Sequence, residues 1–445
     1  MKKAKIIFIL AVLIFLVSCK SEKQNIKSEL ETKMDKIAEQ YVKLVLKVGT
    51  YKPGYVDAYY GPEEWMPAQK EKTEIDSVLI STLNGKADKL LDELYALRDF
   101  NANKMELLRY KFLSKQLLAV KAVIFTLSGN NFSFDEEAKV MYDAEPPHFS
   151  EEHFQKIINK LEDTLPGKGE LRERLHEFLD KFIIPKDKLD TVFTAAINEC
   201  RKRTLRHISL PENENFEVEY VTNKPWGAYN WYKGNSFSLI QVNTDLPVHI
   251  DRAIDLAAHE GYPGHHVYNT LLEKNMVNGR RWMEFSVYPL FSPQSLIAEG
   301  TANYGIKVVF PGKERIRFEK AVLFPLAGLD STDAELYYKV QDLISELNYA
   351  GNEAARNYLN GEWSKDKTKK FIEDFQLRTP ERAAKSLDFI DNYRSYVINY
   401  NLGQDIVKNY IEKNGGTADN PGRRWQLFEE IISTPQTPSG LKVKN

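Results

Sequence analysis

Three histidines and a glutamate stand together in the segment His259-Glu260-Gly261-Tyr262-Pro263-Gly264-His265-His266. In the His-Glu-x-x-His helix, two histidines four residues apart bind zinc, and the glutamate beside the first activates a water molecule. The spacing here is longer, and on an unbroken helix His259 and His265 would point about 120° apart. Pro263 and Gly264 are expected to break the helix and return His265 towards His259. The segment therefore predicts a zinc site with its own general base, Glu260.

A second pairing, between His259 and His266, is also possible on this spacing. Seven residues bring the two side chains nearly into phase, but they start about 10 Å apart along a straight helix. A zinc–nitrogen bond of about 2 Å makes that separation difficult to bridge. We therefore favour His265 as the second ligand, leave the choice open, and expect His266 to orient neighbouring groups or the substrate.

A second segment, Ala298-Glu299-Gly300-Thr301-Ala302-Asn303-Tyr304, follows some thirty residues later. With it, the chain resembles the bacterial domain of unknown function 885 family, whose members are similar to helical gluzincin peptidases such as angiotensin-converting enzyme and the Taq-type carboxypeptidase. The resemblance implies one zinc ion bound by His259, His265 and Glu299, with Glu260 as general base and a water in the open fourth position. It also implies a mainly α, two-lobed multi-helical gluzincin-like fold with a deep cleft.

Two further segments are similar to that family, Tyr55-Val56-Asp57-Ala58-Tyr59-Tyr60-Gly61-Pro62 and Arg394-Ser395-Tyr396-Val397-Ile398-Asn399-Tyr400-Asn401-Leu402-Gly403. The second implies Tyr400 as the hydroxyl that stabilises the developing oxyanion, with Tyr396 in reserve, although either tyrosine could serve packing alone. Arg394 could hold a substrate carboxylate, which would make the protein a carboxypeptidase or dipeptidase, or could form an ordinary ion pair. Thr301 and Asn399 depart from residues common in the family, so the substrate can differ.

Helical patterns dominate the rest of the chain. Ser28 and Glu31 predict a capped helix start, and further helices are expected over about 103–128, 151–165, 170–182 and 186–202. Alternating residues over 216–221 and 236–243 predict a small β-hairpin before the metal helix, and its residues Leu239 to Val242 could pair with a peptide or only support that helix. We divide the body into an N-terminal helical lobe, 28–215, and a catalytic zinc-binding region, 216–435.

The N-terminus has the pattern of an export signal. Lys2, Lys3 and Lys5 precede an apolar run over 6–17 that is short for a membrane span. The run ends in Leu16-Val17-Ser18-Cys19, which resembles a lipoprotein signal, so residues 1–18 are expected to be removed, Cys19 to be lipidated and 19–27 to form a tether. The alternative is an uncleaved membrane anchor. Either way, the body is expected on the periplasmic or extracellular face of the cell envelope.

Composition excludes several classes of protein. The 445 residues are 42% hydrophobic and 28% charged, which is ordinary for a globular protein with a sizeable core. Removing 1–18 takes away three lysines and moves the formal net charge from −2 to −5, so no basic footprint for nucleic acid remains. Cys200 is then the only cysteine besides Cys19, and it is expected to be a buried apolar residue. Composition does not determine the oligomeric state.

The sequence thus predicts a zinc-dependent metallopeptidase of the cell envelope that cleaves peptides near a terminus. The alternative is a catalytically silent surface lipoprotein that binds peptides or other ligands. Glu260 beside His259 favours the enzyme. A purely structural zinc site is less favoured, because such sites prefer a closed set of four ligands rich in cysteine.

Overall fold

Helices make up most of the molecule. The computed structural model describes residues 28–68, 75–224 and 226–442. The α-helices are α1 (Glu29–Gly49), α2 (Ser77–Tyr95), α3 (Lys104–Leu127), α4 (Phe134–Tyr142), α5 (Glu151–Thr164), α6 (Leu171–Asp180), α7 (Leu189–Thr204), α8 (Asp251–Leu256), α9 (His265–Leu272), α10 (Pro293–Val309), α11 (Glu314–Phe318), α12 (Phe324–Ala327), α13 (Ala334–Glu346), α14 (Asn348–Leu359), α15 (Lys365–Phe375), α16 (Pro380–Tyr393), α17 (Ile398–Lys413), α18 (Pro421–Ser433) and α19 (Pro438–Leu441). The predicted mainly α class is confirmed.

Shorter turns and five strands complete the described structure. The 3-10 turns are η1 (Glu63–Trp65), η2 (Lys186–Lys188), η5 (Met283–Ser286) and η7 (Arg394–Val397), and the π-helical turns are η3 (Ala257–Gly261), η4 (Glu273–Asn278) and η6 (Glu319–Leu323). The strands are β1 (Val56–Tyr59), β2 (Asn215–Val221), β3 (Ala228–Gly234), β4 (Phe237–Asn243) and β5 (Val287–Pro289).

Capping residues set the helix starts that the sequence predicts. The Ser28 hydroxyl accepts a hydrogen bond from the backbone N–H of Glu31 (3.0 Å), which satisfies one of the free N–H groups at the start of α1. At α3, Asn103 and Glu106 form a reciprocal capping box. Both predicted starts are confirmed.

The small sheet differs from the predicted hairpin. Its strand order is β2-β4-β3, with β2 parallel to β4 and β3 antiparallel to β4. The hairpin therefore joins β3 to β4, and the predicted pairing of 216–221 with 236–243 as a hairpin is wrong. Because β4 has a strand on each side, its backbone groups are already paired and Leu239–Val242 cannot take a peptide as an added strand.

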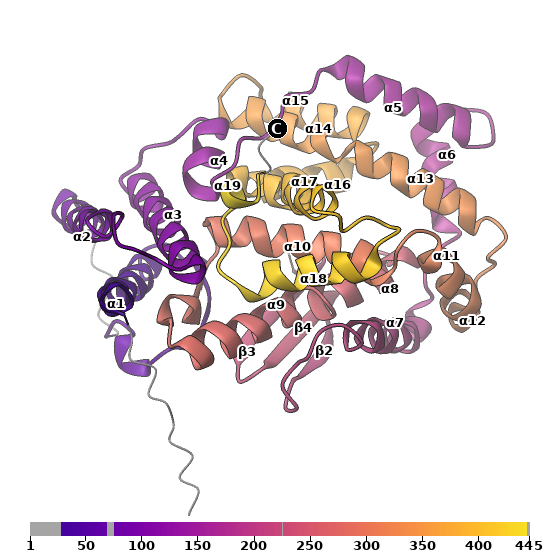
Figure 1. Ribbon diagram of the computed structural model, residues 1–445. Coiled ribbons are helices and arrows are strands. Elements are labelled where there is room, and N and C mark those ends of the chain that lie inside the picture. Colours follow the sequence, from indigo (N-terminus) through magenta and orange to yellow (C-terminus); the bar gives the residue numbers. More distant parts are fainter. Residues whose placement is uncertain (1–27, 69–74, 225, 443–445) are drawn as a thin grey trace, which may run out of the picture.

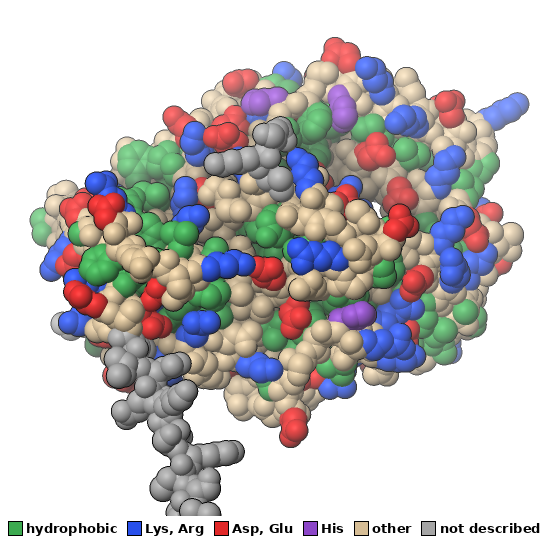
Figure 2. Space-filling view, in the orientation of Figure 1, with side chains coloured by type: hydrophobic (Ala, Val, Ile, Leu, Met, Phe, Trp, Pro, Cys, Tyr) green, Lys and Arg blue, Asp and Glu red, His purple; other side chains and the backbone are tan. Residues whose placement is uncertain are grey.

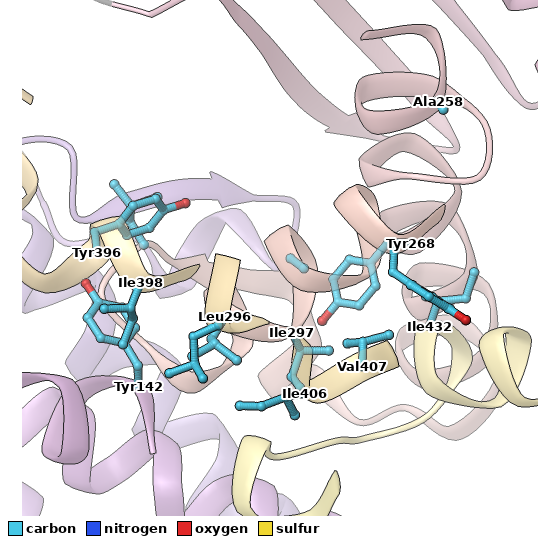
Figure 3. Packing of buried hydrophobic residues seen from close by; sticks show 14 of the residues in the cluster. Tyr142, Ala258, Tyr268, Leu296, Ile297, Tyr396, Ile398, Ile406, Val407 and Ile432 are labelled. Carbon is cyan, nitrogen blue, oxygen red and sulfur yellow. The ribbon is translucent and has the colours of Figure 1, made fainter. Parts of the chain in front are cut away.

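The centre of the molecule is the contact between α10 and α17. Figure 1 shows α10 in the middle, between α17 and the layer that carries α9 and the sheet. Leu296 and Ile297 of α10 lie beside Ile406 and Val407 of α17 in the buried core (Figure 3). The position of α10 is important because this helix carries Glu299.

Two glycines allow this close approach. A Cβ atom on Gly300 would lie 2.4 Å from the backbone carbonyl of Gly403, and a Cβ on Gly403 would lie 2.7 Å from the carbonyl oxygen of Leu296. Such distances are far below van der Waals contact, so only glycine fits at either position. Two segments separated by about a hundred residues thus meet backbone to backbone.

The hydrophobic core runs through both predicted lobes. One cluster of buried residues includes Met34 of α1 and Phe428 of α18, while the division near residue 215 and the two-lobed shape stay predictions. Figure 2 shows acidic and basic side chains interspersed over one face of the molecule. None of the described helices has both the length and the apolar character needed to cross a membrane, and the predicted signal and lipidation residues, 1–18 and Cys19, lie outside the described residues.

Candidate metal centre

The segment between His259 and His265 leaves the regular helix. Helix α8 continues into the π-helical turn η3, the peptide bond between Tyr262 and Pro263 is cis, and α9 begins at His265. A Cβ atom on Gly264 would lie 1.8 Å from the carbonyl oxygen of His259, so this return of the chain requires glycine. The turn brings the Nε2 atoms of His259 and His265 to 3.1 Å from one another.

Glu299 of α10 completes a group of three. Its Oε2 lies 3.3 Å from Nε2 of His259, and its Oε1 lies 3.7 Å from Nε2 of His265. One donor atom from each residue lies within 4.8 Å of the others. Tetrahedral zinc with bonds of about 2.0–2.1 Å separates its ligand atoms by about 3.3 Å, so these separations fit a zinc ion. Glu299 Oε2 is also buried without a hydrogen-bond partner among the described residues, as expected of an atom reserved for an ion.

Neighbouring side chains orient the ligands. His259 Nδ1 donates to the Asn303 amide oxygen (3.0 Å), which leaves the lone pair of Nε2 directed at the group. The Asn303 amide nitrogen donates in turn to the backbone oxygen of Tyr400 (2.9 Å). Tyr396 donates its hydroxyl hydrogen to Glu299 Oε1 (2.9 Å). These partners hold both ring and carboxylate in place.

The electrostatic field at the centre favours a positive charge. Burial alone would lower the pKa of His265, but Glu299 and Glu260 raise it to about 9. Burial would likewise raise the pKa of Glu299, but His265 and His259 hold it well below its ordinary value. The negative potential that favours a proton on His265 also favours a metal cation at the same point.

His266 faces away from the three ligand atoms. It is fully buried, its Nδ1 shares a hydrogen bond with Ser238 (2.9 Å), and its Nε2 lies 3.1 Å from Glu214 Oε2. The Tyr262 hydroxyl donates to the same carboxylate oxygen (2.7 Å). Burial would raise the pKa of Glu214, but these hydrogen bonds and one from Arg201 hold it below its ordinary value. His266 therefore orients its neighbours and anchors the turn, the first of the two roles expected of it, and it does not line the cleft where a substrate contact would require it.

Arg394 is committed to an ion pair inside the protein. Its Nε donates to Glu137 Oε2 (2.6 Å), and the other carboxylate oxygen accepts from the Ser395 hydroxyl (2.6 Å). Glu137 is 2% exposed, and Arg394 does not line the cleft. The predicted role of Arg394 in binding a substrate carboxylate is therefore wrong, because its guanidinium group is taken by a carboxylate 257 residues earlier.

The two tyrosines differ in what they can reach. The Tyr396 hydroxyl is buried and bonded to Glu299, so it positions a predicted ligand rather than contacting substrate. Tyr400 is 38% exposed and lines the cleft. Partial desolvation there, with the charges of Glu299 and Glu260, raises its pKa well above the ordinary value, so the hydroxyl keeps its proton and can donate. Its role at the oxyanion stays a prediction.

The centre lies in the wall of a large cleft of about 1320 Å³, which His259, Glu260, His265 and Glu299 help to line. The Glu260 backbone oxygen accepts a hydrogen bond from Asn230 of β3 (2.7 Å), which fixes the start of the turn.

Sequence reasoning missed Asp57 as a functional residue. It lies on β1, lines the same cleft and accepts a hydrogen bond from the Tyr229 hydroxyl. Burial raises its pKa to about 7; the charge of His265 opposes this and the charge of Glu299 adds to it. The only signal was its place in the Tyr55–Pro62 segment, because its nearness to the metal group comes from the pairing of β1 with β5, just before α10.

Comparisons with known proteins show a shared fold. No family model matches the chain, and no curated protein matches it. A "putative lipoprotein" from Colwellia psychrerythraea matches with a TM-score of 0.50 and 12% identity, over 85% of this chain and 69% of that one. A "putative lipoprotein of unknown function" from Shewanella oneidensis matches with a TM-score of 0.40 and 12% identity, over 80% of this chain and 72% of that one. The first match shows a similar fold, the second is too distant to support an argument, and membership in the domain of unknown function 885 family stays a prediction.

Proposed function

We propose that the protein is a zinc-dependent metallopeptidase held at the cell envelope by a lipid on Cys19. The observation that carries the proposal is the group His259, His265 and Glu299, three ligand types suited to zinc, in the wall of a cleft and beside Glu260. Three protein ligands leave a position open, which is typical of catalytic rather than structural zinc. The resemblance to gluzincins agrees with this assignment.

Each side chain has a task in amide hydrolysis. A zinc ion, when bound, would polarise the scissile carbonyl and acidify a water molecule. Glu260 takes the proton from the attacking water and delivers it to the leaving nitrogen. Tyr400 donates a hydrogen bond to the developing oxyanion from α17, while Asn303 and Tyr396 keep the ligands oriented.

The alternative is a lipoprotein that binds zinc and a ligand without catalysis. The length of the cleft favours it, because the lining extends well beyond the metal group. The fold shared with a lipoprotein from Colwellia psychrerythraea agrees with a binding protein as well as with an enzyme.

Zinc content and turnover of matched variants test the proposal. Wild type is expected to hold about one zinc per chain and His259→Ala little, while the control His148→Ala, a histidine with a 69% exposed side chain, keeps the wild-type content. Glu260→Gln is expected to keep zinc and lose at least about a hundredfold in peptide turnover, because the general base is gone. If Glu260→Gln cleaves peptides as fast as wild type, the assignment of Glu260 as the general base is wrong. Zinc retention with no cleavage in a peptide library would favour the binding protein.

A further inference from the structure

Two arginines of the cleft stand out among the described residues. Arg378 and Arg382 both line it. Within the described part of the chain, neither side chain forms a hydrogen bond or an ion pair, unlike Arg315, which pairs with Asp255 (2.8 Å) in the same cleft. A guanidinium group carries five N–H donors. Leaving two such groups partly desolvated and unpaired costs free energy, unless a ligand supplies the acceptors.

The backbone holds Arg378 in this position. It lies in the short linker between α15 and α16, where Leu377 has a φ of 54°, in the left-handed region that is unfavourable for leucine. The Leu377 side chain is 6% exposed, and its carbonyl oxygen lies 3.2 Å from the ring nitrogen Nε2 of His176. This anchored, strained residue precedes Arg378 directly. The linker is therefore fixed in a conformation that presents the next side chain to the cleft.

The surroundings leave an excess of positive charge. Burial and the neighbouring Arg382 lower the pKa of Arg378 to about 10. Burial and Arg252 lower the pKa of Arg382, with Asp180 as the opposing acid. Lys385 of α16 also lines the cleft. Asp255 is shared between Arg252 (3.4 Å) and Arg315, and Asp251, the residue before Arg252, accepts a hydrogen bond from the Tyr337 hydroxyl (2.6 Å), so neither acid is paired with Arg378 or Arg382.

The helix that carries the metal group also carries a residue beside the arginines. Arg252 precedes His259 by seven residues on the continuous stretch formed by α8 and η3. The charge of Arg252 acts on Arg382, and Arg252, Arg382 and His259 all line the cleft.

We propose that Arg378 and Arg382 bind a carboxylate of a peptide whose scissile bond lies at Glu260 and the metal group in the same cleft. Two parallel N–H groups of a guanidinium match the two oxygens of a carboxylate. The carboxylate is either the free C-terminus or an acidic side chain. This inference rests on the proposed function for the scissile bond, but the carboxylate site itself can be tested by binding alone.

The test measures binding by calorimetry on the zinc-loaded chain with Glu260→Gln, so that no probe is hydrolysed. The probes are penta-alanine with a free carboxylate, penta-alanine amide, and the same amide with one glutamate in place of an alanine. We expect the free acid to bind at least about tenfold more tightly than the amide, and Arg378→Gln to abolish that difference. Tight binding of the glutamate-containing amide would show that the site accepts acidic side chains, and weak binding would assign it to the C-terminus.

Two control variants make the result specific. Arg378→Lys keeps the positive charge but cannot donate two parallel N–H bonds to a carboxylate, so it should retain only part of the preference for the free acid. Arg206→Gln removes an exposed arginine outside the cleft and should change nothing. Equal binding of acid and amide by the unsubstituted site, or an unchanged preference in Arg378→Gln, would overturn the proposal.

The two proposals fail in different ways. If the chain prefers the free acid but the wild type cleaves no peptide, the proposed peptidase activity is contradicted and the proposed carboxylate site is supported. If the wild type cleaves peptides but the chain binds acid and amide equally, the proposed carboxylate site is contradicted and the proposed peptidase activity is supported.

Discussion

The charged side chains of the metal group have hydrogen-bond partners in the protein, whereas those of the arginine site in the same cleft have none among the described residues. At the metal group, His259 is held by Asn303 and Glu299 by Tyr396. At Arg378 and Arg382, which line the same cleft, the side chains form no hydrogen bond or ion pair with any described residue. A resident ion needs ligands fixed in advance, and a ligand that comes and goes needs donors that the protein has left free. The contrast therefore distinguishes a site built to hold an ion permanently from a site built to bind and release a ligand.

Gly300→Ala should have the largest effect on the metal group. The added Cβ would meet the backbone of Gly403, which cannot move aside cheaply, so we expect a loss of about 3 kcal/mol in the free energy of unfolding and reduced zinc content. The control is Gly85→Ala in α2, where no atom lies within 4 Å of the added methyl. It should gain about 0.5–1 kcal/mol from helix propensity. Urea unfolding measures both, and equal stability of the two variants would contradict the role of this contact.

Arg394→Ala sharpens the contrast between paired and free arginines. It leaves the nearly fully buried Glu137 with one partner fewer, so we expect a loss of about 2 kcal/mol in the free energy of unfolding. The affinity for penta-alanine should not change. Arg378→Gln should do the reverse, with an unchanged unfolding midpoint and weaker binding of the free acid. A stable Arg394→Ala with weakened peptide binding would restore the substrate role predicted from the sequence.

Asn303→Ala should have the smallest of these effects. It removes the acceptor that orients His259, so zinc affinity should fall by about tenfold with little change in stability. Asn303→Asp keeps an oxygen acceptor for the ring N–H and should retain zinc as tightly as wild type. Competition with a chelator measures both variants. Equal zinc affinity in Asn303→Ala and wild type would show that the ring is held by the turn alone.

Local pattern predicted the helices and the turn after His259 because both depend on neighbours in the sequence. Cap residues such as Ser28 act within one helical turn, and Pro263 with Gly264 disrupts the helix where they stand. The sequence could not show which of His265 and His266 faces the metal group, because this depends on which face of α9 packs against Glu214. That Glu299 lies near the two histidines came from the family resemblance rather than from any pattern in the residues.

Long-range partners explain the errors. The sequence could not decide between a substrate carboxylate and an ion pair for Arg394, because Glu137 lies far away in the sequence. It did not single out Asp57, because the pairing of β1 with β5 brings that residue to the centre. In the sheet, alternation predicted strands over 216–221 and 236–243 but could not tell that 228–234 would form the antiparallel partner of β4. Arg378 belongs to no motif, and the only feature that distinguishes it is that no described residue forms an ion pair with its side chain.

The contact between Gly300 and Gly403 also limits how the cleft can move. Turning α17 about its axis by one residue, about 100°, would place Leu402 or Gln404 where Gly403 meets α10, and the side chain would clash with the backbone there. The contact therefore fixes the rotation of α17 against α10, so Glu299 and Tyr400 keep their relative position. Phe389 of α16, the helix that carries Arg382, lies against Tyr396 and Tyr400. The arginine site is thus attached to the same packed unit as the metal group.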